Sequence, residues 1–154
     1  MKKLSLLFLL TFSILFYACS NDDDVKISDA NLSGTVEGVD FSFSDGFCFT
    51  SDNSVDNKTY LDIFLANAEI SCSKFYDYEF ARVHVFGEIP VAVGTYTSGF
   101  TVAFGNEGVT GINLISGSTL IITEITDTYV TGKLKANSSS NNKVEGSFTV
   151  YFCD

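Results

Sequence analysis

The residues with the most reactive side chains in this chain are four cysteines and a single histidine. Cys19 ends an N-terminal apolar run, whereas Cys48, Cys72 and Cys153 are spread over the remaining sequence. The three cysteines after Cys19 suit disulfide formation in an oxidising compartment. His84 would be the sole imidazole available as a catalytic base, but it lies in an alternating apolar–polar stretch, so a solvent-facing position on a strand is the better interpretation.

Other signs of enzymatic chemistry are weak. The chain has no G-x-S-x-G motif and no cysteine placed as an evident nucleophile. Its 19 acidic residues guarantee some paired carboxylates by chance, which is too little to indicate a glycoside hydrolase. Residues 52–57 (DNSVDN) offer oxygen ligands for calcium but lack the glycine and glutamate of an EF-hand. The sequence therefore predicts no enzymatic activity, no metal and no cofactor.

A cluster of aromatic residues is the better candidate for ligand contact. Phe75, Tyr76 and Tyr78 lie close together just before a strand-like stretch. Exposed aromatic rings on a β surface can stack on sugar rings or line an apolar cavity. We hypothesise that these three side chains face a carbohydrate or protein ligand.

The N-terminal stretch Met1–Asp24 has the layout of an export signal. Two lysines precede a 15-residue apolar run, Leu4–Ala18. As a helix this run would extend about 22 Å, short of the roughly 30 Å of a bilayer core. We therefore expect a cleaved helical signal peptide over residues 1–18, not a membrane span.

The segment Leu15–Cys19 (LFYAC) resembles the lipobox of bacterial lipoproteins. The resemblance implies cleavage before Cys19 and acyl chains on that cysteine, which would attach the protein firmly to a membrane. The alternative is an ordinary signal peptide cut near Ala18, which would release a soluble protein. The following Ser20–Asp24 (SNDDD) is similar to the acidic tag that sends lipoproteins of one Gram-negative phylum to the cell surface. That likeness implies an outer-membrane protein facing the exterior; the alternative is a plain solvated tether on an inward-facing lipoprotein.

Composition limits the remaining sequence to one acidic domain. Removing residues 1–18 leaves 136 of the 154 residues and takes away Lys2 and Lys3 but no acid, so the net charge moves from −10 to −12. Binding to a phosphate backbone needs clustered lysine and arginine, which excludes nucleic acid as a partner.

Strand signals dominate the mature sequence. It is rich in β-branched and aromatic residues, with frequent turn residues and no sustained helical repeat. The final strand is the clearest, because Val144, Gly146, Phe148, Val150 and Phe152 share one face. We predict an all-β fold, a single antiparallel β-sandwich or barrel of about 8–10 strands over residues 32–154, preceded by a lipidated cysteine and acidic tether over 19–31.

A weaker resemblance covers about the last 60 residues. Gly94–Tyr96, Leu120–Thr123, Val130–Leu134 and the closing V-x-G-x-F-x-V from Val144 are similar to small uncharacterised β-rich outer-membrane lipoproteins of the same bacterial group. Those proteins have no agreed activity, so the likeness implies a fold and a location but no chemistry.

One disulfide and one free thiol are expected among the three later cysteines. Loop-closure entropy is too similar for the different pairings to choose between them. We favour Cys72–Cys153, because Cys72 lies in a loop and Cys153 ends the last strand, where a bridge would secure the terminus. Cys48–Cys153 and Cys48–Cys72 stay open as alternatives.

Three functional hypotheses follow. The first is a lipid-anchored envelope protein with a non-enzymatic binding or structural role. The second is a lipocalin-like carrier of a small apolar ligand, which needs a closed barrel with an unfilled interior. The third is a surface carbohydrate-active hydrolase that uses paired carboxylates in a cleft.

Overall fold

The computed structural model describes residues 26–72, 80–106, 113–115 and 117–153. In these ranges the fold is built from strands, as the sequence predicts. The strands are β1 (Ser33–Val36), β2 (Val39–Ser42), β3 (Asp45–Asn53), β4 (Lys58–Ala66), β5 (Arg82–Gly87), β6 (Gly94–Tyr96), β7 (Phe100–Gly105), β8 (Asn113–Ile115), β9 (Thr119–Ile125), β10 (Tyr129–Ser139) and β11 (Asn142–Phe152).

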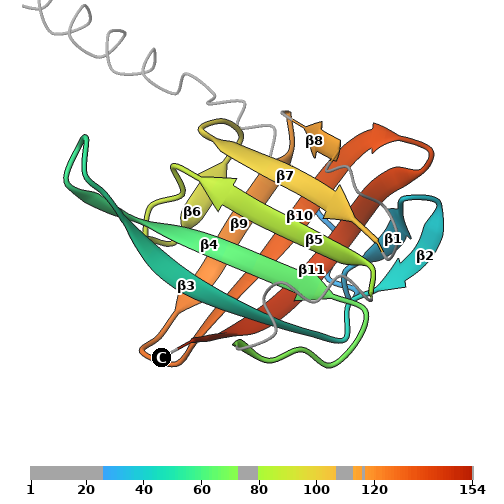
Figure 1. Ribbon diagram of the computed structural model, residues 1–154, viewed down its shortest axis with the longest axis horizontal. Coiled ribbons are helices and arrows are strands. Elements are labelled where there is room, and N and C mark those ends of the chain that lie inside the picture. The colour runs from blue at the N-terminus through green and yellow to red at the C-terminus, as the bar shows by residue number, and fades with distance from the viewer. Residues whose placement is uncertain (1–25, 73–79, 107–112, 116, 154) are drawn as a thin grey trace, which may run out of the picture.

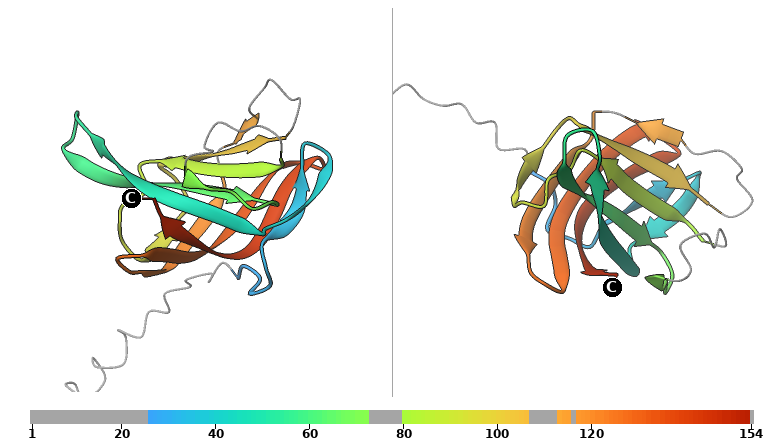
Figure 2. Two further views of the ribbon diagram at one scale, coloured as in Figure 1. Left: turned by 60° about the horizontal axis from the view of Figure 1, so that its bottom comes forward. Right: turned by 60° about the vertical axis from the view of Figure 1, so that its left-hand side comes forward.

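All of these strands belong to one sheet. Its order is β6-β9-β10-β11-β3-β4-β5-β7-β8, and the β1–β2 hairpin joins it through β1, which pairs with β11. The path is open between β6 and β8, and the sheet curls so that β3, β4, β5 and β7 lie over β6, β9, β10 and β11 as a half-barrel (Figures 1 and 2). The all-β prediction is confirmed. The paired strands are antiparallel except β11 and β3, which run parallel with Tyr151 opposite Phe47 and Phe152 opposite Cys48.

The core fills the concave side of the sheet. Alternation along β11 sends Val144, Phe148 and Val150 inward, as expected from the sequence. Strands β4, β5 and β7 form the opposite layer of this core. Their fully buried side chains include Leu61, Ile63, Leu65, Val83, Val85 and Phe104. These side chains pack into one continuous cluster.

The N-terminal segment joins the fold before the first strand. Ile27 is 5% exposed and Leu32 is fully buried. Main-chain hydrogen bonds of 2.8 Å join Leu32 and Ala30 to Ser147 of β11. Ala30 and Leu32 are therefore tied to β11 by their main chain.

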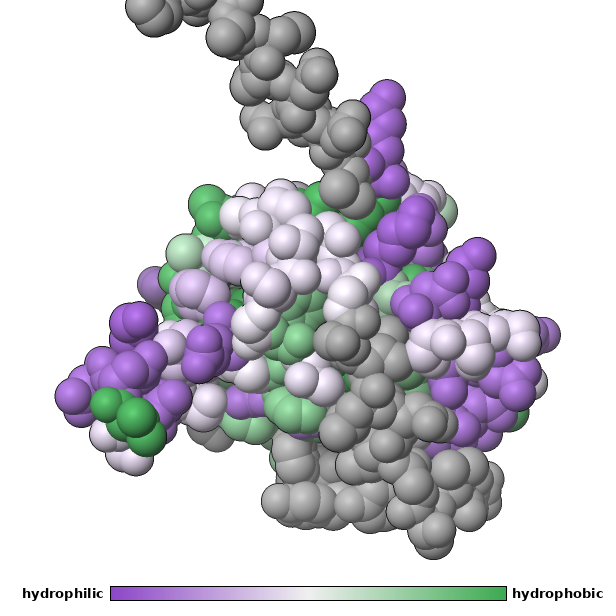
Figure 3. Space-filling view, turned by 90° about the horizontal axis from the view of Figure 1, so that it is seen from above, coloured by the Kyte–Doolittle hydropathy of each residue, from purple (hydrophilic) through white to green (hydrophobic). Residues whose placement is uncertain are grey.

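The β3–β4 hairpin extends beyond the rest of the sheet (Figures 1 and 2). In the space-filling view its end is a mostly hydrophilic projection (Figure 3). Val55, near the tip, is 89% exposed. Asn57 adopts a left-handed conformation (φ 55°), which a tight turn requires and which asparagine tolerates better than most residues.

Candidate functional site

The sequence-predicted sites fall partly outside the described structure. Cys19 and the aromatic residues Phe75, Tyr76 and Tyr78 lie outside the described residues. The predicted disulfide lies inside them. Cys72 and Cys153 are joined, with their Cα atoms 5.7 Å apart, and Cys48 is a buried free thiol.

Strand alternation explains this pairing. Phe152 and Cys48 are register partners, and both pack with the core. Cys153 follows Phe152, so its side chain is directed to the outer side of the sheet, where it meets Cys72 from the segment after β4. Cys48 faces the other way and cannot join either of them without a change of register.

The outer side of the sheet carries a row of aromatic side chains that crosses five neighbouring strands. We call it the aromatic row. Its members, one from each of β10, β11, β3, β4 and β5 in register, are Tyr129, Tyr151, Phe47, Phe64 and His84.

Ring contacts hold the row together. The ring centroids of Phe47 and Phe64 are 5.0 Å apart, and those of Phe64 and His84 are 3.8 Å apart, both stacked. Tyr129 and Tyr151 meet edge to face at 6.5 Å. Such pairs stabilise a sheet beyond the area that they bury. Because Phe64 stacks on both Phe47 and His84, the Phe64 ring presents little free face to a ligand.

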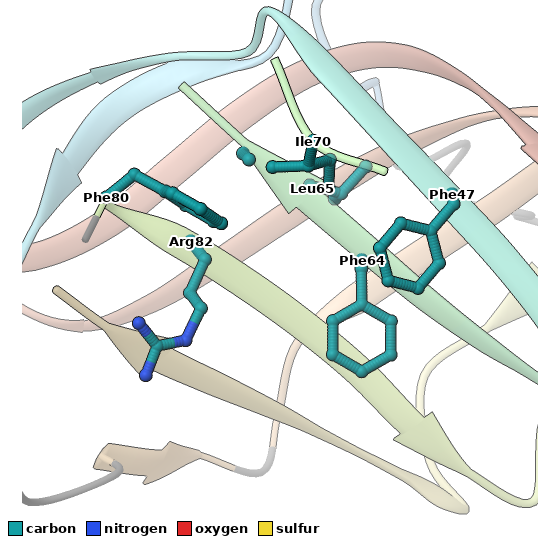
Figure 4. Close-up of a pocket in the computed structure, with 7 residues that line it drawn as sticks. Phe47, Phe64, Leu65, Ile70, Phe80 and Arg82 are labelled. Carbon is teal, nitrogen blue, oxygen red and sulfur yellow. The ribbon is translucent and has the colours of Figure 1, made fainter. Parts of the chain in front are cut away.

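The middle of the row is covered by the chain itself. Phe47 and Phe64 are 5% and 8% exposed although they point away from the core. Ile70 and Phe80, from either end of the segment between β4 and β5, lie with them around a cavity of about 10 Å³, room for about one water molecule (Figure 4). Asp45 accepts a hydrogen bond from the Ile70 main-chain N–H at 3.1 Å. This contact holds Ile70 beside Phe47 and Phe64.

Both ends of the row reach solvent. Tyr151 is 61% exposed and Tyr129 is half-buried. At the other end His84 is half-buried beside Phe86, whose ring centroid lies 4.5 Å from the imidazole. The parts of the row available to a ligand are therefore its two ends.

Polar groups beside His84 form a chain with Asp62 at its centre. The Ser51 hydroxyl donates to Asp62 Oδ2 at 3.0 Å, and His84 Nε2 lies 3.4 Å from Asp62 Oδ1. In a hydrolytic triad the imidazole stands between the hydroxyl and the carboxylate and takes the hydroxyl proton. Here the carboxylate occupies that place, so the arrangement lacks the order needed to activate Ser51. His84 is half-exposed on the outer side, as the alternation predicts.

The candidate calcium loop at the β3–β4 tip uses its oxygens internally. Asp52 accepts a hydrogen bond from Thr59 Oγ1 at 2.7 Å, and Asp56 accepts one from the Tyr60 hydroxyl. The Asp56 bond raises the pKa of Tyr60 to about 12 and holds the pKa of Asp56 below its usual value. Among the described residues no three of the His, Cys, Asp and Glu side chains are grouped as a metal site would need.

Sequence reasoning did not identify the aromatic row. Its members lie in different strands, and their proximity depends on the pairing β10-β11-β3-β4-β5. A signal was nevertheless present in β4: Phe64 is a large apolar residue in the phase of Asp62, whereas the other phase, with Leu61, Ile63 and Leu65, already supplies the core.

Comparisons with protein-family models, with curated proteins and with solved structures find no match for this chain. Within the described ranges, no helix has the length and hydrophobicity to cross a bilayer.

Proposed function

We propose that this chain is an exported lipoprotein, held at the outer membrane by acyl chains on Cys19 and displayed toward the exterior, with a non-enzymatic binding or structural role. The observation that carries the proposal is the spacing in Met1–Asp24: a basic start, an apolar run too short to span, and a cysteine followed at once by an acidic stretch.

One feature of the fold supports this proposal. The Cys72–Cys153 disulfide fits a protein that matures outside the cytoplasm. The solvent-exposed ends of the aromatic row, at Tyr151 and at His84, are where a binding partner would make contact.

Metabolic labelling with a palmitate analogue tests the anchor. We expect label on the wild type and none on Cys19→Ala. Cys48→Ala is the matched control, because it removes the buried free thiol and leaves Cys19 in place. Label that persists in Cys19→Ala would contradict the proposal.

Protease treatment of intact cells tests display. Cleavage of the domain in intact cells is expected for outward display. Protection in intact cells, followed by cleavage after lysis, would place the domain on the inner side of the membrane.

A further inference from the structure

One exposed end of the aromatic row lies beside a group of polar side chains. Tyr129 and Tyr151 are register partners on β10 and β11, and the next outer row of the same strands holds Thr131 opposite Thr149. Glu124 of β9 is the register partner of Thr131 on its other side. We call these five residues the tyrosine–threonine patch. They come from three adjacent strands of one sheet, which fixes their positions relative to one another.

Tyr151 offers an aromatic face to solvent. It is 61% exposed, and its ring contact in the described structure is the edge-to-face pair with Tyr129. Such a pair occupies at most one face of a ring, so it leaves at least one face of Tyr151 open. The face of an aromatic ring carries partial negative charge and attracts the weakly positive C–H groups of a sugar ring, which is why sugars stack on it.

Groups that bind hydroxyls lie next to this ring. The Tyr129 hydroxyl donates to Glu124 Oε1 at 3.0 Å, and this bond raises the pKa of Tyr129. A carboxylate accepts through two oxygens, so Glu124 retains capacity for further donors. The Oγ1 atoms of Thr131 and Thr149 lie 3.1 Å apart, and whichever hydroxyl donates, the hydrogen of the other stays available to a ligand. The patch therefore has both a donor and an acceptor for the hydroxyls of a sugar.

The surroundings of Tyr151 suit a sugar better than a protein partner. A specific protein interface buries about 800 Å² on each side around an apolar centre. On β9, β10 and β11, Tyr151 is the one large hydrophobic side chain that is exposed. Along the outer side of β11 it is followed by Thr149 and Ser147 and then by the charged Glu145. This side of the sheet thus lacks the apolar area that a protein partner needs.

The charges around the patch disfavour acidic sugars. Glu124 lies within it, and Asp127 is exposed in the turn between β9 and β10. Lys133 occupies the next outer row of β10, but its ammonium group is paired with Asp29. An anionic polymer would meet like charge here and no uncompensated cation among these residues. The patch therefore favours a neutral ligand.

We propose that the tyrosine–threonine patch binds a neutral glycan, with one pyranose ring stacked on Tyr151 and its hydroxyl groups bonded to Thr149 and Glu124. This inference rests on the binding role proposed above and not on the lipid anchor. Outer residues two apart on a strand are separated by about 7 Å, so a sugar on Tyr151 can reach the Thr149 hydroxyl. β-Linked glucose and xylose units fit best, because their equatorial hydroxyls leave C–H groups on both ring faces. A single shallow contact binds weakly, and a polymer gains from repeated units held close to the site.

Affinity electrophoresis in native gels measures this binding. The full chain is purified with its anchor in a polyoxyethylene detergent, because maltoside detergents carry sugar headgroups of their own. The gels contain hydroxyethyl cellulose or xyloglucan as neutral polymers, or alginate as an acidic one. We expect both neutral polymers to retard the wild type and alginate to leave its migration unchanged.

Variants at position 151 locate the site. Tyr151→Ala should raise the concentration of neutral polymer needed for retardation by at least about tenfold, and Tyr151→Phe, which restores the ring, should bind more strongly than Tyr151→Ala. Val55→Ala is the matched control, because it shortens an exposed hydrophobic side chain at the tip of the β3–β4 hairpin. The chain contains no tryptophan, so Tyr151→Trp also supplies a probe whose emission should change with added cellohexaose. The emission of Val55→Trp should not change.

Two results would overturn the inference. Equal retardation of Tyr151→Ala and the wild type would show that the glycan binds elsewhere, which leaves the general binding role standing. A wild type that neither neutral polymer retards, or that alginate alone retards, would show that a neutral glycan is not the ligand. Palmitate labelling of the same samples reports on the anchor separately, so failure of the anchor and failure of the glycan site are distinguishable.

Discussion

A main-chain hydrogen bond of 2.8 Å joins the Cys153 N–H to the Cys48 carbonyl. The side chains of these two cysteines nevertheless point to opposite sides of the sheet. Cys48 is fully buried in the core, and Cys153 bonds to Cys72 on the outside. A short distance between two backbones therefore does not determine which cysteines form a disulfide. The side of the sheet to which each side chain points determines it.

Loss of the disulfide should destabilise the fold substantially. The bridge closes a loop of 81 residues, for which the chain-entropy model gives about 4.5 kcal/mol. We expect Cys72→Ser to lower the free energy of unfolding in urea by an amount of that order. Cys48→Ala retains the bridge and serves as control. A wild type whose unfolding curve is the same with and without reductant would contradict the prediction.

The free thiol should be chemically silent until the protein unfolds. Burial raises the pKa of Cys48 to about 12, and the thiolate is the reactive form. Iodoacetamide at pH 8 should leave the folded protein unmodified by mass spectrometry and add one group in urea. Rapid alkylation of the folded protein would show that Cys48 is accessible.

The same pKa shift has a stability consequence at alkaline pH. In the unfolded chain the thiol ionises near its ordinary pKa of 9.0, before the folded form does. The stabilising contribution is therefore complete below pH 9 and is lost as the pH rises toward 12. Cys48→Ala should show a smaller loss of urea stability over this range than the wild type.

The Tyr60–Asp56 hydrogen bond should be visible by titration. With its hydroxyl donated to Asp56, Tyr60 should ionise near pH 12 in a spectrophotometric titration of the folded protein, and Tyr60→Phe should lack that step. The variant should also raise the pKa of Asp56, followed by NMR, because the bond that lowers it is gone. An unchanged Asp56 titration would mean that the bond does not form in solution.

Gly34 should tolerate no side chain. A Cβ atom there would collide with the Lys143 carbonyl, where β1 lies against β11, and the φ of +153° adds strain. We expect Gly34→Ala to lower the free energy of unfolding by more than about 2 kcal/mol. At Gly117 (φ +89°) a Cβ meets nothing within 4 Å, so Gly117→Ala should cost the backbone strain alone, of order 1 kcal/mol. Equal losses would show that β1 adjusts to the added methyl.

Local patterns predicted the individual strands well. Leu61, Ile63 and Leu65 share a face in the sequence and are fully buried in the structure. Val83 and Val85 face the core, and His84 between them is half-exposed. Alternation of this kind is a property of each strand alone, which is why it can be found in a single sequence.

The order of the strands could not be predicted in the same way. The parallel contact of β11 with β3 joins residues about a hundred positions apart, and nothing local to either strand specifies it. The aromatic row depends on this register, because Tyr151 and Phe47 become neighbours only through it. The sequence therefore indicated an all-β domain and the disulfide, but not the outer surface on which the aromatic row lies.

The position of β11 constrains how the sheet can come together. This strand pairs with β10, β1 and β3, so it joins the two halves of the sheet. Its parallel pairing with β3 closes a loop of about a hundred residues, and contacts between such distant parts of a chain form slowly. We therefore expect the pairing of β11 with β3 to limit the rate at which the domain folds.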